Sequence, residues 1–188
     1  MYQATHDALT GLANYREFVD ALEREVKRAD RSHNMFAVLL PDLDKLKQIN
    51  DRNGHLAGNR ALKRLANVMR EHCRAAIDIA ARYGGDEFAL VLIDADPAMA
   101  GQVAQRIQEG LLTEIEEPVL GVSIGIASYP ADGRTGQELL EAADHRLYQQ
   151  KQIPERNCRL RADANSIRKP YNPAPAFHSF ETALTYRE

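Results

Sequence analysis

Four residues that combine backbone freedom with acidic groups stand together at Gly84, Gly85, Asp86 and Glu87. A glycine turn lets backbone N–H groups approach a phosphate closely, and adjacent acids can hold a divalent cation that neutralises that phosphate. Oxygen ligands of this kind suit Mg²⁺ or Mn²⁺. The stretch therefore predicts a metal-assisted phosphate site, although acidic turns can also simply cap helices or stay solvated.

A second acidic cluster follows a short apolar run. The run MFAVLL (35–40) predicts a buried strand, and the segment PDLDKLKQIND begins at its C-terminal end. We expect this strand to place Asp42 near the same sheet edge as Asp86 and Glu87. A purely structural role does not need three converging acids, so the pattern favours catalysis over a passive role.

Apolar periodicity predicts the elements that position these acids. Four helices are indicated by Phe18, Leu22, Val26 and Ala29; by Leu62, Leu65, Ala66 and Met69; by Val103, Ile107 and Leu111; and by Leu139, Leu140, Ala143 and Leu147. Strands are predicted at 35–40, 79–83 and 88–93 and within 119–129. The two runs around the glycine pair predict a hairpin whose loop is wider than two residues. The order helix, strand, helix, strand, strand, helix, strand, helix predicts an α/β (α+β) fold with a mixed sheet covered by helices.

Composition limits the function classes. With 188 residues and a net charge of −3, the chain offers no basic face for a nucleic-acid polymer. Cys73 and Cys158 lie far apart, so neither a disulfide framework nor a zinc site is predicted, and a reducing compartment fits. No apolar run approaches the roughly 20 residues that span a bilayer. We expect a cytoplasmic domain without membrane contact.

The C-terminal part of the chain has a different composition. From about Arg161 the periodic pattern gives way to KPYNPAPAFHSF, whose prolines oppose both helix and central strand. We therefore predict one domain over residues 1–161 and a proline-containing tail over 162–188.

Residues 6–157 resemble GGDEF domains, the family of diguanylate cyclases. The signature itself is present at 84–88, and three further blocks stand in the family's order: HDALTGLANYREF (6–18), DLDKLKQINDRNGHLAGN (42–59) and ADHRLYQQK (143–151). The resemblance implies a mainly antiparallel sheet like the palm of nucleotide cyclases and polymerases. It implies that each domain binds one GTP and that two domains face each other as a homodimer, forming cyclic di-GMP and two pyrophosphates. An upstream sensor or regulatory domain in a longer protein is also implied.

The resemblance assigns roles to particular residues. Metal would be held by Asp42, the backbone carbonyl of Leu43, Asp86 and Glu87, and the catalytic residues would be Asp86 and Glu87. Asp86 is the candidate base, although a carboxylate bound to a cation loses basicity. The substrate-binding set would be Asn50, His55, Asn59, Gly84, Gly85 and Lys151: the glycines cradle phosphate, Asn50 and Asn59 bind guanine, and Lys151 reaches the triphosphate.

Structural alternatives stay open for some of these positions. His55 could occupy a turn or cap the helix that follows. Lys151 could be a solvated charge that suits a helix end. We expect Asp7 and Thr10 to fix the start of the first helix rather than touch substrate, and Arg82 to be a sheet-face residue.

The first departure from the family pattern is Asn59, where an aspartate is usual. Guanine presents two donors that a carboxylate accepts with both oxygens, whereas an amide offers one acceptor and one donor. Losing one charge-assisted bond costs about 1.5 to 3 kcal/mol, roughly ten- to a hundred-fold in affinity. An amide instead matches an adenine edge. The open alternatives are a weakly GTP-specific cyclase, a cyclase of relaxed base specificity, and a degenerate domain that acts as a GTP-binding regulatory module.

Two more departures concern the flanks of the site. Family members often carry Arg-x-x-Asp before the signature, where product binds and inhibits; here Asp78 is in place but Ala75 replaces the arginine, and Arg74 is one residue off. A one-residue shift turns a side chain by about 100° on a helix or to the other face of a strand. We therefore predict that the inhibitory product site is lost unless Arg74 bends back. Pro154 and Glu155 replace the usual glycine-containing turn after the last helix.

Overall fold

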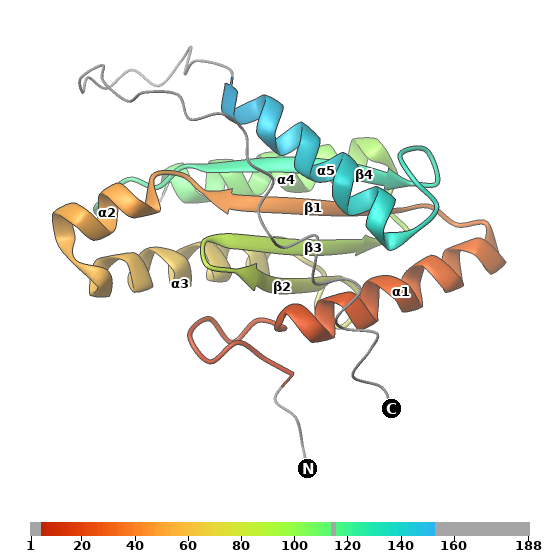
Figure 1. Cartoon of the computed structure of the whole chain (residues 1–188), viewed down its shortest axis with the longest axis horizontal. Helices are drawn as coiled ribbons and strands as arrows, with labels where there is room; N and C mark the ends of the chain where they lie inside the picture. The colour runs from red at the N-terminus through yellow and green to blue at the C-terminus, as the bar shows by residue number, and fades with distance from the viewer. Residues whose placement is uncertain (1–4, 114–115, 153–188) are drawn as a thin grey trace. The chain divides into compact units, whose positions relative to one another are not determined.

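The computed structural model describes residues 5–113 and 116–152, and these form a four-stranded sheet with helices on both faces (Figure 1). In chain order the elements are α1 (Tyr15–Ser32), β1 (Phe36–Leu43), α2 (Leu46–Asn53), α3 (His55–His72), β2 (Ile79–Gly84), β3 (Glu87–Ile93), α4 (Pro97–Thr113), β4 (Val122–Tyr129) and α5 (Gly136–Gln152). The predicted fold class, helices around a mainly antiparallel sheet, is confirmed. The predicted domain boundary at 161 and the Pro154 turn lie outside the described residues.

Strand β1 lies in the interior of the sheet. The strand order is β2-β3-β1-β4, and all three neighbouring pairs among the described strands are antiparallel. Every residue of β1 is buried, which is why a continuous apolar run predicted it. Because β1 and β3 are antiparallel, the last residues of β1 lie beside the first residues of β3, next to the turn from β2.

The helices form a layer on each face of the sheet. Figure 1 shows α1 and α5 on one face and α3 and α4 on the other. Leu39 and Leu90 of the strands belong to one core cluster with Leu65 of α3 and Ile107 of α4. On the opposite face α5 packs against β4 and β1, and α1 packs against β2. The two layers bury alternate residues of the same strands, as the two-residue period of a strand requires.

Helix α1 begins at a side-chain cap. The Asn14 side chain accepts a hydrogen bond from the Glu17 amide at 3.0 Å, which satisfies one of the free donors at a helix start. Phe18 and Leu22 of this helix are fully buried. The periodic apolar residues that predicted the helix therefore form the side that packs against the domain.

Two local expectations are wrong. One helix was expected after β1, but the chain forms two, α2 and α3, separated by Gly54 with φ 81°. Helix α2 has eight residues and buries only Ile49, so it lacks the repeated apolar spacing that identifies longer helices. The hairpin loop is also shorter than expected, because Gly84 pairs with Glu87 across a two-residue turn and the ladder is irregular between Arg82 and Gly84.

No helix within the described ranges is long and apolar enough to cross a membrane.

Candidate active site

The acids of the two predicted clusters meet at one edge of the sheet. Asp42 of β1 and Glu87 of β3 are direct partners in the antiparallel ladder. Asp86 belongs to the same edge, since its carbonyl accepts a hydrogen bond from the Leu43 amide at 3.2 Å. The structure thus brings together the carboxylates that are about 45 residues apart in sequence, and it places them beside the glycine turn.

Lys151 joins this edge from the last turn of α5. Its Nζ atom lies 2.7 Å from Oδ2 of Asp42, whose side chain is only 11% exposed. Helix α5 reaches this position because it lies close against β4: a Cβ added to Gly125 would be 2.0 Å from the carbonyl oxygen of Ala143. Lys151 is therefore an ion-pair partner of the acid cluster and not a solvated charge at a helix end.

The environment of this sheet edge disfavours the ionised forms of Asp42 and Glu87. Burial raises the pKa of Asp42 above its ordinary value; the Lys151 charge opposes the shift, and the charges of Asp86 and Asp44 add to it. Burial likewise raises the pKa of Glu87, and the negative charges of Asp42, Asp86 and Asp144 raise it further. Among the described residues, the Lys151 charge lowers the pKa of both Asp42 and Glu87, but burial together with the neighbouring carboxylates outweighs it.

Whether these residues suit a divalent cation depends on their donor chemistry. In residues 5–113 and 116–152, no three His, Cys, Asp or Glu side chains form a group that could hold a metal ion by themselves. The predicted set contains three such side chains, Asp42, Asp86 and Glu87, so the structure does not gather all three as one group; a smaller set of Asp42, Asp86 and the Leu43 backbone carbonyl needs only two side chains. Carboxylate and carbonyl oxygens are the hard donors that suit Mg²⁺ or Mn²⁺. The donor set fits such an ion, and the assignment stays a prediction.

Arg82 holds the glycine turn through hydrogen bonds to its backbone. This guanidinium donates to the Gly85 carbonyl oxygen from Nη2 at 2.7 Å and from Nε at 3.1 Å. It also forms an ion pair with Asp7 at 3.3 Å. Arg82 therefore connects the signature turn to the N-terminal segment. The expectation that Arg82 is a sheet-face residue missed its ion pair with Asp7, because Asp7 is 75 residues away in the sequence.

Asp7 and Thr10 bond to each other in the N-terminal segment and do not cap α1, whose cap is Asn14. The carboxylate of Asp7 accepts hydrogen bonds from the Thr10 amide at 2.8 Å and from its hydroxyl at 2.6 Å. Burial raises the pKa of Asp7, but the Thr10 hydrogen bonds and the Arg82 charge outweigh burial and hold the pKa below its usual range. An ionised Asp7 is thus the form that anchors Arg82 and, through it, the turn.

The turn leaves its outer side open. Gly85 has φ 27°, and a Cβ built on it would meet no described atom within 4 Å. A Cβ on Gly84 would lie 3.6 Å from Oε2 of Glu87, which is ordinary contact. Among the described residues, the space on the Cβ side of Gly85 is therefore open, next to the Glu87 carboxylate.

The residues assigned to base recognition lie on α2 and α3. Asn50 is in α2, while His55 is the first residue of α3 and Asn59 follows one turn later. His55 does not cap α3, since the cap position is Gly54 and no side chain bonds to it. Figure 1 shows α2 at the end of the sheet where β1 ends, so this group and the acid cluster lie at the same end of the domain.

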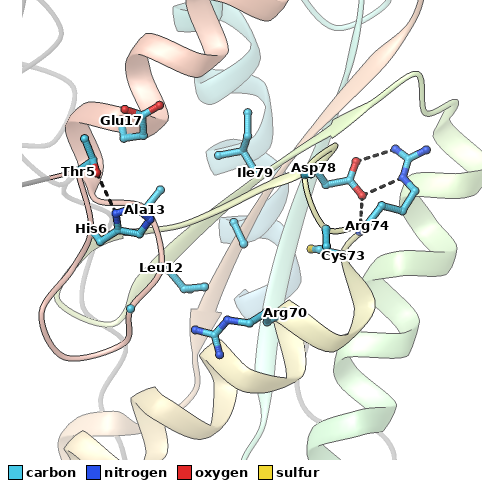
Figure 2. Close-up of a pocket in the computed structure, with 14 residues that line it drawn as sticks. Thr5, His6, Leu12, Ala13, Glu17, Arg70, Cys73, Arg74, Asp78 and Ile79 are labelled. Atoms are coloured by element: carbon cyan, nitrogen blue, oxygen red, sulfur yellow. Dashed lines mark hydrogen bonds and ion pairs between the residues drawn. The ribbon is translucent and has the colours of Figure 1, made fainter.

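The position of the family's product site is occupied by a closed ion pair. Asp78 Oδ1 and Oδ2 accept from Nη2 and Nε of Arg74 at 2.6 and 3.0 Å, and Arg74 Nη2 also donates to the Ile93 carbonyl. Figure 2 shows these two side chains pointing toward each other beside a pocket of about 590 Å³ that Ala75 also lines. The Asp78 side chain is 2% exposed. Arg74 is thus engaged in an ion pair with the buried Asp78 carboxylate, although its own side chain is 43% exposed, and Ala75 presents no donor.

Comparisons with known proteins agree on one family. The family described as "Diguanylate cyclase, GGDEF domain" matches residues 4–157. The chain is similar to the bifunctional diguanylate cyclase/cyclic di-GMP phosphodiesterase MucR of Pseudomonas aeruginosa, with 41% identity over 152 residues. That match covers 79% of this chain and 22% of MucR, so the chain spans about a fifth of that relative.

Solved structures give the same result. The GGDEF domain of TpbB from Pseudomonas aeruginosa is 37% identical with a TM-score of 0.74, and the match covers 79% of this chain and 90% of that one. The GGDEF domain of DgcB from Caulobacter crescentus, solved in complex with c-di-GMP, is 28% identical with a TM-score of 0.75 over 80% of this chain and 92% of that one.

Proposed function

Because the chain belongs to the GGDEF family of diguanylate cyclase domains, we propose that it condenses two molecules of GTP into cyclic di-GMP. In each half-reaction a 3′-oxygen bonds to the α-phosphorus of the other GTP, and the bond from that phosphorus to the β-phosphate oxygen breaks. One pyrophosphate leaves per half-reaction, and the 3′-hydroxyl proton passes to a carboxylate. The observation that carries this proposal is the meeting of Asp42, Glu87 and Lys151 at one sheet edge beside the Gly85 turn.

The chain's own groups divide the work of binding. The open backbone at Gly85 receives phosphate, and Lys151 transfers its contact from Asp42 to the triphosphate when substrate arrives. A divalent cation held by Asp42, the Leu43 carbonyl and Asp86 would polarise the α-phosphoryl group and gather the triphosphate oxygens.

Asp86 and Glu87 are the two candidate acceptors of the 3′-hydroxyl proton. Asp86 is the family's candidate, but a carboxylate on a cation is a weaker base. The pKa of Glu87 is raised by burial and by neighbouring charges, which favours proton acceptance. We assign the proton to the Asp86–Glu87 pair as a unit.

One domain provides one GTP site, so the reaction needs two copies with their sites facing each other. We propose a homodimer that forms for catalysis, in a cytoplasmic protein whose upstream regulatory domain controls the encounter. MucR is a bifunctional protein of which this chain matches 22%, which is consistent with a catalytic module inside a larger chain.

A second candidate function follows from Asn59. This residue is exposed on α3 and replaces the usual aspartate. Its amide matches guanine less well than a carboxylate does, so the same site would accept ATP in competition and form mixed cyclic dinucleotides. A GTP-binding domain without turnover is the remaining alternative.

The test is turnover by the purified chain with Mg²⁺ and GTP, ATP or both, followed by chromatography of the nucleotides. We expect cyclic di-GMP and two pyrophosphates per product with GTP, and no product from an Asp42→Ala variant that keeps its circular dichroism spectrum. Glu71→Ala, at an exposed position of α3, is the matched control and should keep full activity. Nucleotide binding without product would identify a regulatory module, and mixed dinucleotides would support relaxed specificity.

A further inference from the structure

We propose that Gly58 is a positioning residue for base recognition: its missing side chain provides the space in which the Asn50 amide is held toward the nucleotide. This inference rests on the proposed function, because it concerns how the same site selects its base. It goes beyond the assigned roles, since Gly58 itself touches no substrate.

The geometry at Gly58 is specific. Gly58 is a buried residue in the second half of the first turn of α3, directly before Asn59. A Cβ built on it would lie 2.0 Å from Oδ1 and 2.9 Å from Cγ of Asn50, and 3.2 Å from Cδ1 of Leu46. Atoms at 2.0 Å overlap severely, so no other residue fits at position 58 while Asn50 keeps its place.

Backbone freedom does not explain this glycine. Gly58 is not among the glycines with positive φ, and a glycine inside a helix lowers stability relative to alanine. Gly101, in the first turns of α4, has the same helical context, but a Cβ there would meet no described atom within 4 Å. Glycine is therefore required at position 58, despite its cost in helix stability, because α2 approaches α3 closely there.

Packing, not hydrogen bonding, holds the Asn50 amide. Within residues 5–113 and 116–152, no hydrogen bond of the Asn50 side chain is formed, although its backbone carbonyl accepts from the Gly54 amide at 2.8 Å. The amide is half-buried between Leu46 and the bare Cα of Gly58. Its donor and acceptor are thus oriented by their surroundings and remain available to a base edge.

A side chain at position 58 would disturb both base contacts. Helix α2 packs against α3, so an added methyl group must either turn the Asn50 amide away or push the two helices apart. Asn59 is the next residue of α3, and a shift of this turn moves it as well. The three described atoms nearest to a Cβ at position 58 all belong to α2, and none belongs to β1 or to the β2–β3 turn at the phosphate end of the site.

The experiment compares four proteins with the parent chain: Gly58→Ala, Asn50→Ala, the double variant, and Gly101→Ala as the control. Equilibrium affinity for GTP and for inosine triphosphate, which lacks the 2-amino group, is measured with Mg²⁺ alongside thermal melting and the kinetic constants. We expect Gly58→Ala to weaken GTP binding at least tenfold, to reduce the preference for GTP over inosine triphosphate, and to raise KM more than it lowers kcat. Gly101→Ala should change none of these.

The double variant tests whether the effect of Gly58→Ala arises from a clash with the Asn50 side chain. Asn50→Ala removes the atoms that a methyl group at position 58 would strike, so the double variant should melt at a higher temperature than Gly58→Ala and bind GTP no more weakly than either single variant. It also keeps the test possible if Gly58→Ala alone fails to fold. Undiminished GTP affinity in Gly58→Ala, or additive losses in the double variant, would overturn this proposal. Absence of GTP binding by the parent chain would instead overturn the proposed function.

Discussion

Replacing Glu87 with glutamine is expected to stabilise the metal-free domain while impairing turnover. Glu87 faces Asp42 directly across two strands, and burial together with neighbouring charge raises the pKa of both carboxyl groups. Directly opposed cross-strand pairs are worth roughly 0.2–1 kcal/mol, and like charges act against the fold. At about 2–4 °C per kcal/mol for a domain of this size, the gain is an increase in Tm of about 0.5–4 °C.

The gain in Tm should depend on pH, and this dependence distinguishes a charge effect from a packing effect. A raised pKa in the folded state means that the folded protein holds the Glu87 proton more tightly than the unfolded chain does. As the pH falls from neutral through the raised folded pKa toward the unfolded value near 4.3, this destabilisation disappears. The difference in Tm between Glu87→Gln and the parent chain should therefore shrink on acidification, because the glutamine has no proton to gain.

The assay is thermal melting in EDTA at several pH values, repeated with Mg²⁺ at neutral pH. Glu71→Gln, at an exposed position, removes the same charge away from the cluster and serves as the control. Binding of a cation to the folded state stabilises it by mass action, so Mg²⁺ should raise the Tm of the parent chain more than that of Glu87→Gln. A Glu87→Gln protein that melts below the parent in EDTA at neutral pH would refute the reasoning.

Three further outcomes are expected. Gly125→Ala should lower stability by about 1–3 kcal/mol in denaturant titrations, because its Cβ would lie 2.0 Å from the backbone oxygen of Ala143, whereas Gly101→Ala should not. The rate per protein should rise with protein concentration, since two half-sites must meet; a flat dilution series would contradict the dimer. Calorimetric titration of cyclic di-GMP should show weak binding that Arg74→Ala leaves unchanged, and tight binding lost in that variant would show that a shifted product site still works.

The sequence was sufficient where the apolar pattern is long and regular. The apolar runs of β1 and β3 and the periodic faces of α1, α3, α4 and α5 all predicted elements that the structure contains. Helix α2 was missed because its eight residues bury only Ile49, and its packing partner is α3, which no local pattern reveals. The predicted turn was too wide because the apolar pattern stops at Tyr83 and resumes at Phe88, whereas Gly84 and Glu87 also pair in the ladder.

The candidate site shows the same division between local and tertiary information. The sequence predicted that Asp42 lies near Asp86, because an acidic segment directly follows the apolar run of the strand. That Lys151 contacts Asp42 depends on how closely α5 lies against β4, and the contact of Arg82 with the Gly85 carbonyl depends on the path of the turn. The Lys151–Asp42 distance follows from the packing of segments far apart in the chain, and the Arg82–Gly85 contact follows from the local conformation of the turn, so no spacing in the sequence could supply either.

In the proposed cyclase, the pairing of Arg74 with Asp78 and the amide at Asn59 would act in the same direction on regulation. The exposed Arg74 guanidinium already pairs with the buried Asp78 carboxylate, so a product molecule would have to break an existing ion pair to bind there. If Asn59 binds guanine as proposed, its weaker contact would raise the GTP concentration at which the enzyme saturates. We therefore expect a cyclase whose output follows substrate supply and the encounter of two domains, and not the accumulation of its own product. Restoring both family residues, with Ala75→Arg and Asn59→Asp, should lower KM for GTP and introduce product inhibition; if neither changes, the two departures do not set the regulation.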